Sequence, residues 1–370
     1  MIDLDGSDGG GQLVRTALTL SALDREAFRM ERVRGNRSNP GLKRQHLACV
    51  KTVAALTDAD IEGAAIGSET LRFEPTAGPD ATDAPDEVAV DIRTAGSVTL
   101  VADTLLPLAT RIDGPVRADL TGGTDVQWSP STDYLRRVKL PLLRGFGLDA
   151  DVAVERRGFF PAGGGELAVA VQPSSLEPIE FGEREGATPD RDAPGIDAPS
   201  SAPDASVHAV AATDLDGGDT ADELADAAVT ELHDRGIDGA ATAATASVDA
   251  DSPGSVLTVA VGEPPGPGGE TGSPASRAGF VGYGGADDHP PSLAESVADA
   301  VERWLATGAP VDAHLADQLV VWVALAGGAV PIPRLTDHVR TNVDLVSEFG
   351  YDVSIADRGG TPTVVSSGDG

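Results

Sequence analysis

The chain has 370 residues, with 59 Asp or Glu against 27 Lys or Arg, so its formal net charge is −32 at pH 7. This balance excludes a protein that coats nucleic acid through bulk positive charge. The single cysteine, Cys49, excludes a disulfide framework and a cysteine-based zinc site. Hydrophobic residues make up 41% of the chain, which is enough for one large core or two ordinary ones.

The sequence predicts no targeting or membrane segment. Its first residues have neither the basic nor the apolar region of a signal peptide. The longest apolar run, residues 319–330, is shorter than the roughly 20 residues that a membrane-spanning helix needs. We therefore expect a soluble, cytoplasmic protein with no membrane partner.

The acidity is accompanied by scarce lysine, with 3 Lys against 24 Arg. We interpret this as adaptation to a salty cytosol, because a Debye length of about 3 Å at 1 M salt screens the self-repulsion of the surface. The alternative is an acidic surface that binds a basic partner.

The charge is unevenly distributed. Residues 180–300 carry a net charge of −20, whereas residues 25–51 carry +6 and residues 136–157 carry +3. The guanidinium group matches phosphate oxygens in shape. The two basic segments therefore favour a strip that binds phosphate or nucleic acid, with ordinary ion pairs on helix surfaces as the alternative.

One pattern of elements occurs three times along the chain: an apolar helix, a short strand, a polar-capped helix and a pair of strands. The first helices are predicted at 9–22, 94–109 and 313–326, the strands at 28–34, 116–120 and 329–333, the second helices at 39–56, 131–146 and 336–349, and the strand pairs at 60–73, 149–171 and 351–365. The pattern predicts an α/β (α+β layered) fold of three repeated βαβαββ units, each with helices on one face of a four-stranded sheet. A doubly wound sheet, or unrelated helices with similar loops, are the alternatives.

A change of composition separates the second unit from the third. Residues 183–206 are rich in Pro, Ala, Asp and Ser, and residues 207–261 again show strand, helix and strand patterns. The sequence therefore predicts core units 1 and 2 at 1–179, a small inserted α/β domain with an acidic linker at 180–278, and core unit 3 at 279–370. The alternative for the middle segment is a long acidic surface excursion with little fold of its own.

Common catalytic motifs such as the P-loop and HExxH are absent from the sequence. The glycines at 9–11 before a helix can present backbone N–H groups to a phosphate. His338 follows the potential caps Thr336 and Asp337, where a helix N-terminus disfavours a positive ring; a neutral imidazole can attack phosphorus. From position alone, an ordinary helix-start histidine is favoured over a nucleophile for His338, whereas His46 is equally compatible with phosphate contact and with surface solvation.

Eight segments in a fixed order resemble the RNA 3′-terminal phosphate cyclase family. They are LDG at 4–6, GGGQLVR at 9–15, RSNPGLKRQHL at 37–47, TAGS at 94–97, GGTD at 122–125, RGFFPAGGG at 157–165, HLADQ at 314–318 and HVRTN at 338–342. The resemblance covers nearly the whole chain outside 180–280, and the set is specific although no single segment is.

The resemblance implies a core of three repeated units similar to the C-terminal domain of translation initiation factor 3, with a smaller inserted domain. It also implies the reaction. A histidine takes AMP from ATP, AMP passes to an RNA 3′-phosphate to give an RNA(3′)pp(5′)A end, and the 2′-hydroxyl closes a 2′,3′-cyclic phosphate. ATP, a divalent metal (Mg or Mn) and RNA with a 3′-phosphate end are the implied cofactors and partner.

The resemblance also implies roles for individual residues, matched by position. His338 is the expected nucleophile, and Asp8 falls where relatives carry a metal-binding glutamate. The expected ATP-binding residues are Asp103, His314, Leu315, Ala316, Asp317, Gln318, Arg15 and Arg37. The residues expected at the RNA end are Arg44, Gln45 and His46.

The family also contains catalytically silent relatives, which act as RNA-binding modules in ribosome assembly. That branch lacks the nucleophilic histidine. Because His338 and Asp317 are both present here, the sequence favours the enzyme.

Overall fold

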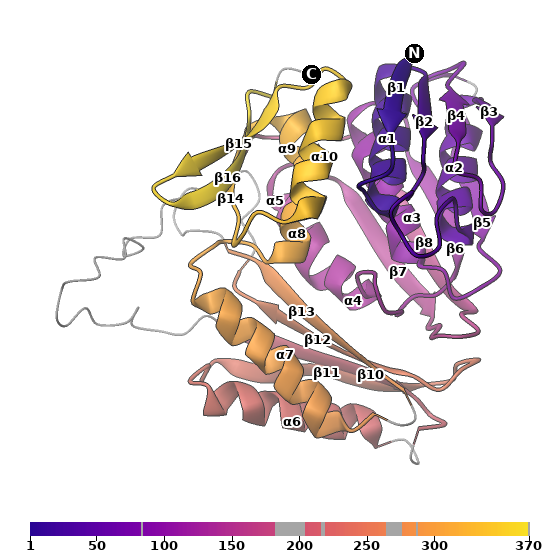
Figure 1. Cartoon of the computed structure of the whole chain (residues 1–370). Helices are drawn as coiled ribbons and strands as arrows, with labels where there is room; N and C mark the ends of the chain where they lie inside the picture. Colours follow the sequence, from indigo (N-terminus) through magenta and orange to yellow (C-terminus); the bar gives the residue numbers. More distant parts are fainter. Residues whose placement is uncertain (83, 182–203, 216–218, 264–275, 286–287, 369–370) are drawn as a thin grey trace.

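The fold described below is that of a computed structural model of the chain. The structure describes residues 1–368 except residues 83, 182–203, 216–218, 264–275 and 286–287. It is a mixed α+β protein built from four-stranded sheets covered by helices (Figure 1). No helix within these described ranges is long and apolar enough to cross a membrane.

The first sheet has the strand order β1-β2-β4-β3, in which β1 and β2 are parallel and the other neighbours antiparallel. Its elements are β1 (Ile2–Asp5), α1 (Gly11–Asp24), β2 (Phe28–Glu31), α2 (Arg44–Thr57), β3 (Asp60–Glu62) and β4 (Leu71–Glu74). The loops that follow β1 and β2 leave the same end of the sheet, because the paired residues Asp5 and Glu31 end both strands.

The second sheet repeats this arrangement in the order β5-β6-β8-β7, with β5 and β6 parallel. Its elements are β5 (Glu87–Asp91), α3 (Val98–Leu105), the short helix η1 (Leu106–Thr110), β6 (Val116–Gly122), α4 (Thr132–Tyr134), the π-helical turn η2 (Leu135–Lys139), α5 (Leu140–Gly145), β7 (Ala150–Arg156) and β8 (Gly165–Val171).

The third sheet has the order β15-β16-β14-β9, and its parallel pair is β9 and β14. Its elements are β9 (Ile179–Glu180), α8 (Ala313–Gln318), α9 (Val320–Ala326), β14 (Gly328–Pro331), α10 (Asp337–Glu348), β15 (Val353–Arg358) and β16 (Thr361–Ser366). The three sheets thus share one pairing pattern: a parallel pair followed by two antiparallel strands.

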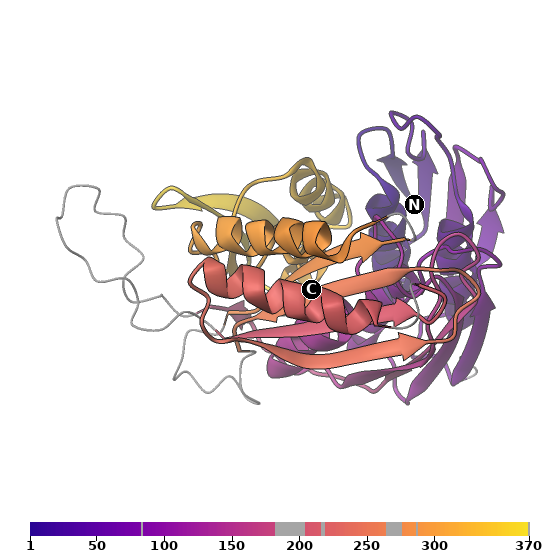
Figure 2. The ribbon, with the colours of Figure 1, turned by 90° about the horizontal axis from the view of Figure 1, so that it is seen from below.

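The fourth sheet lies between β9 and α8 in the chain and has a different order, β11-β10-β12-β13. Its elements are β10 (Ala205–Ala212), α6 (Thr220–Asp234), β11 (Ala240–Val248), β12 (Ser255–Val261), β13 (Ala278–Gly284) and α7 (Pro290–Leu305). Helices α6 and α7 lie side by side on its outer face (Figure 2). Its inner face packs on the second unit, where the Ser131 and Thr258 hydroxyls are 2.9 Å apart.

The boundaries predicted for the inserted domain, 180 and 278, do not coincide with the ends of the fourth sheet and its helices. β13 pairs along its length with β12, and Trp304 of α7 is buried in the apolar cluster of the fourth sheet. The fourth sheet and its helices therefore continue to Leu305. The glycine- and proline-rich composition before 278 suggested a return to the core, but the next strand belongs to the same sheet. At the other boundary, β9 belongs to the third sheet rather than to the second unit.

Several predicted helices also differ from those observed, and two of them illustrate why. The helix expected at 39–56 begins at Arg44, because Gly41 has a left-handed backbone (φ 73°) that interrupts a helix. The helix expected at 313–326 is two helices, α8 and α9. The capping predicted for α10 is confirmed: the Thr336 hydroxyl accepts a hydrogen bond from the Val339 N–H at 3.2 Å.

Helix α1 is the centre of the main core, where it contacts α2, α3 and α10. Its residues are almost all buried, including polar ones such as Gln12 and Thr19. A buried polar side chain needs a partner. Thr16 has one in α10, where its hydroxyl donates to Asn342 Oδ1 at 2.8 Å. This bond joins the first unit to the third.

Candidate active site

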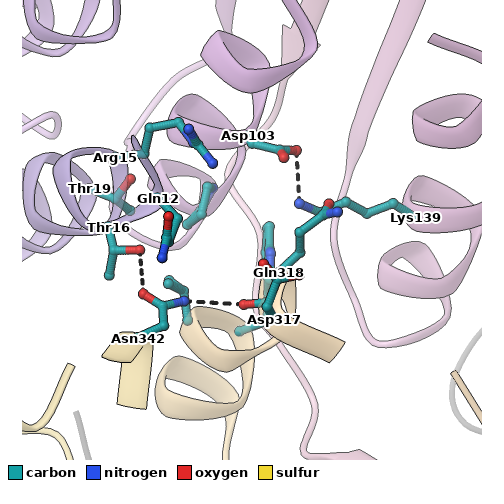
Figure 3. A pocket seen from close by; sticks show the side chains of 12 residues that line it. Gln12, Arg15, Thr16, Thr19, Asp103, Lys139, Asp317, Gln318 and Asn342 are labelled. Atoms are coloured by element: carbon teal, nitrogen blue, oxygen red, sulfur yellow. Dashed lines mark hydrogen bonds and ion pairs between the residues drawn. The ribbon is translucent and has the colours of Figure 1, made fainter. Parts of the chain in front are cut away.

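A cavity of about 50 Å³ lies where the three units of the core meet (Figure 3). One wall is a face of α1 with four polar side chains, Gln12, Arg15, Thr16 and Thr19. Their spacing of three and four residues places them on one side of the helix. Thr16 and Thr19 bond within the protein, to Asn342 and to the Thr104 carbonyl oxygen. Gln12 and Arg15 are the members of this face that a polar ligand could contact.

The opposite wall comes from the second and third units. Lys139 of η2 forms an ion pair with Asp103 of α3 at 2.8 Å, and both side chains are nearly buried. Asp317 and Gln318 come from α8, and Asn342 Nδ2 donates to the Asp317 carbonyl oxygen at 3.1 Å. Asn342 thereby fixes α10 relative to both α1 and α8.

His338 lies in the first turn of α10, next to Asp317 of the cavity wall. Its Nδ1 is 3.4 Å from Asp317 Oδ2, and its Nε2 is 3.4 Å from an Arg37 guanidinium nitrogen. The histidine side chain is 50% exposed and the Asp317 side chain 17%, so the ring is accessible to a ligand while its carboxylate neighbour is held in place. The fold thus brings the predicted residue Arg37 to His338, which lies 301 positions later in the chain and contacts the predicted Asp317.

Two amide groups in the cavity wall have no hydrogen-bond partner within the described part of the chain. They are Gln12 Nε2 and Gln318 Oε1, both buried. Leaving a buried polar atom unpaired costs about 1–3 kcal/mol. One is a donor and the other an acceptor, so a bound molecule with both kinds of group, such as a nucleotide, would satisfy them. This fits the ATP site that the resemblance implies.

His46 is buried beneath the start of α1, which contradicts the interpretation of its ring as surface-solvated. Its Nδ1 accepts the Lys43 N–H at 2.9 Å, so the ring proton is on Nε2. A Cβ atom added at Gly11 would lie 2.3 Å from that Nε2. Gly11 is therefore needed for the close approach of the ring to the helix.

The pKa of His46 is lowered to about 3, first because burial disfavours the charged ring and then because Arg15, Arg34 and Lys43 are nearby. In the unfolded chain the histidine pKa is near 6.5. Between about pH 3 and pH 6.5, His46 is therefore protonated in the unfolded chain but neutral in the folded one. We predict that His46 reduces the free energy of unfolding as pH falls from about 6.5 towards 3, by up to about 1.4 kcal/mol per pH unit.

Denaturant unfolding of the wild type and His46→Asn at several pH values in molar salt measures this effect. The variant should lose stability less steeply below pH 6.5. Equal slopes would show that His46 is protonated in the folded protein as readily as in the unfolded one.

The structure places the other predicted residues as follows. Arg44 is exposed at the first position of α2, and Gln45 Oε1 accepts the Ser97 N–H at 3.4 Å. Asp8 is exposed and accepts from Asn36 Nδ2 at 2.7 Å. No group of three or more His, Cys, Asp or Glu side chains that could hold a metal occurs among the residues described.

The segment at 314–318 divides into two parts. Asp317 and Gln318 line the cavity, whereas His314 is exposed and does not line it. Leu315 and Ala316 are buried in the apolar core. Their side chains therefore pack the helix that carries Asp317 and Gln318.

The sequence predicted no individual role for five polar residues of the cavity wall: Gln12, Thr16, Thr19, Lys139 and Asn342. The spacing of the polar residues on α1 is a signal that identifies Gln12 and Thr16. Lys139 is one of only three lysines in the chain, which also marks it. Asn342 is marked only as the last residue of the HVRTN segment, and its contacts were not predictable because its partners Thr16 and Asp317 lie in other segments.

A histidine paired with a carboxylate beside a polar cavity is the arrangement of a catalytic centre. The sequence model of the family described as RNA 3′-terminal phosphate cyclase matches residues 7–355. The chain belongs to this family and is an enzyme of it.

Three relatives named RNA 3′-terminal phosphate cyclase illustrate the similarity. The protein of Halobacterium salinarum is 43% identical over 95% of this chain and 96% of its own length. That of Pseudomonas fluorescens is 35% identical over 94% and 92%, and that of Methanosarcina mazei is 34% identical over 94% and 95%. The similarity therefore includes the inserted fourth sheet and is not limited to the core.

Proposed function

We propose that this protein converts the 3′-phosphate of RNA to a 2′,3′-cyclic phosphate with ATP, through a covalent histidine–AMP intermediate. The observation that carries the proposal is the contact of His338 with Asp317 and Arg37 beside a cavity with two unpaired amide atoms. The shared name of the relatives supports the same reaction.

The first step follows from the two neighbours of His338. Asp317 faces Nδ1, so it favours the tautomer with the proton there, and Nε2 then carries the lone pair. Nε2 attacks the α-phosphorus, a nitrogen–phosphorus bond forms, and the bond to the pyrophosphate oxygen breaks. Arg37, beside Nε2, can neutralise charge on the phosphoryl oxygens.

The later steps use the same position. An oxygen of the RNA 3′-phosphate attacks the phosphorus of the histidine adduct, which forms a diphosphate and restores the free ring. The 2′-hydroxyl then attacks the RNA phosphorus, loses its proton, and expels AMP. Because the hydroxyl is on the same ribose, proximity supplies several kcal/mol of the barrier.

The polar lining of the cavity supports the proposal that ATP binds there. Gln12, Gln318 and Asp103 offer both donors and acceptors to a nucleoside, and Arg15 adds a positive charge. The enclosed space is smaller than a nucleotide, so we expect the side chains at its mouth to move on binding. Asp8 is the carboxylate proposed for the metal. One carboxylate plus substrate phosphates is a usual set for Mg²⁺, which would polarise a phosphoryl oxygen.

The shared strand order of the three sheets supports the proposal of repeated βαβαββ units similar to the C-terminal domain of translation initiation factor 3. The silent RNA-binding module is not favoured, because His338 and Asp317 are both present and in contact. The cytoplasmic location stays a prediction.

The proposal is tested with an RNA oligonucleotide that ends in a 3′-phosphate, incubated with ATP and Mg²⁺ or Mn²⁺ in molar salt. We expect the end to become resistant to phosphatase, and the conversion to require ATP. The same RNA with a 3′-hydroxyl end is the control. An end that stays sensitive to phosphatase, with protein that is folded by circular dichroism, would refute the proposed reaction.

A further inference from the structure

Two large aromatic side chains face solvent at one end of the second sheet. Trp128 is 96% exposed and Phe160 is 73% exposed. The other two tryptophans, Trp304 and Trp322, are buried. Tryptophan is highly buried on average, and exposed apolar groups often mark a surface that binds something. These two side chains have no role in the cavity described above.

The loops that carry the two aromatics are neighbours. Gly122 ends β6 and pairs with Gly165, which begins β8, so loops 123–131 and 157–164 leave the same end of the sheet. The Thr124 N–H donates to the Gly158 carbonyl at 2.9 Å. The two aromatics are therefore presented from adjacent loops.

Both loops are held firmly. The Arg157 guanidinium bonds Asp125 Oδ2 at 2.9 Å and Asp133 Oδ2 at 2.6 Å, and all three side chains are largely buried. Trp128 has a left-handed backbone (φ 69°), which is unfavourable for a bulky side chain. A rigid loop that displays a strained, solvent-exposed tryptophan suits a stacking platform.

The aromatic loops connect through direct contacts with the first basic segment, residues 25–51. A Cβ at Gly163 would lie 2.9 Å from the Ala95 backbone, next to the loop that precedes α3. In that loop, the Ser97 N–H donates to Gln45 of α2 at 3.4 Å. The platform is thus joined to the start of α2, where Arg44 lies.

The basic segment in turn reaches the nucleophile. A Cβ at Gly10 would lie 3.2 Å from the Arg37 guanidinium, which also approaches His338 Nε2. Residues 32–46 contain five bases and no acid in a chain of net charge −32. A continuous series of contacts therefore leads from His338 along a basic segment to the two aromatics.

We propose that Trp128 and Phe160 stack on nucleobases of single-stranded RNA upstream of the 3′-phosphate, while the basic segment holds the backbone. This inference rests on the proposed function, since it extends the binding of the same RNA end. Unpaired bases stack on aromatic side chains regardless of their sequence. Stacking is not weakened by ionic screening, so it can hold RNA at molar salt where phosphate contacts are weak.

The tryptophan itself reports binding. Since Trp304 and Trp322 are buried, an RNA oligonucleotide with a 3′-phosphate should quench mainly the emission of Trp128. The quenching should be strong in the wild type at molar salt and absent in Trp128→Phe. No quenching in the wild type, or equal quenching in the variant, would overturn the inference. This readout needs no turnover, so it is independent of whether the cyclase reaction occurs.

Kinetics separates stacking from a structural role. Trp128→Ala and Phe160→Ala should each raise KM for the oligonucleotide about tenfold, and Trp128→Phe and Phe160→Tyr should restore most of it. Replacing the upstream bases by abasic sugars should raise KM for the wild type. The same replacement should not raise KM for the variant that combines Trp128→Ala and Phe160→Ala, because that variant has no aromatic side chain for the bases to stack on. Wild-type KM values in the alanine variants would refute the inference. Lack of any cyclic product with the wild type would instead refute the proposed function.

Discussion

Replacement of His338 by alanine is expected to abolish the covalent protein–AMP adduct that forms with ATP and a divalent metal. The variant lacks the Nε2 lone pair that attacks the α-phosphorus, and the loss of a nucleophile lowers turnover by roughly 10⁴-fold or more. The measurement is transfer of label from ATP radiolabelled at the α-phosphate to protein on a denaturing gel. The wild-type adduct should be labile in acid and stable in alkali, as a phosphoramidate is.

His289→Ala is a matched control for this experiment. His289 is also an exposed histidine at the start of a helix, but it precedes α7 of the inserted sheet. Its removal should leave the adduct at the wild-type level. An adduct of normal yield in His338→Ala would exclude this histidine as the nucleophile.

Replacement of Asp317 by asparagine is expected to slow adduct formation by about 10²- to 10³-fold. The Asp317 carboxylate lies 3.4 Å from His338 Nδ1 and favours a proton on that atom, whereas an amide can donate to Nδ1 and favour the wrong tautomer. The distance of 3.4 Å and the half-exposed ring make the effect smaller than in a fully buried pair. Single-turnover rates with saturating ATP measure the change.

Asp344→Asn is the control for charge. It removes one carboxylate charge, as Asp317→Asn does, but at an exposed position of α10. It should form the adduct at the wild-type rate, which would show that the loss in Asp317→Asn is not an effect of net charge. A wild-type rate in Asp317→Asn would mean that the carboxylate does not set the tautomer of the ring.

Much of the fold follows from local patterns in the sequence. The Thr336 cap, the apolar periodicity of α1 and the glycine turn at 163–165 each act over a few residues, so they are visible without the structure. The end of the inserted domain, at α7, could not be predicted from local patterns. It depends on the pairing of β12 with β13, which local composition does not encode.

The candidate site was predicted only in part, and chiefly through the family resemblance. His338, Asp317 and Arg37 were named from matching segments, and the fold places them in contact. The paired Lys139 and Asp103, and the unpaired Gln12 and Gln318, needed the structure. Which side chain has a partner depends on contacts between distant segments, and no motif carries that information.

Lys139 lines the cavity beside which His338 lies, and its amine is a second candidate nucleophile. The position of the nucleotide on the chain is therefore the most direct test of the mechanism. Protein incubated with ATP and metal is digested at neutral pH or above, and the peptides that carry AMP are sequenced by mass spectrometry. We predict AMP on the peptide that contains His338. AMP on Lys139, or on any other residue, would contradict the proposed chemistry.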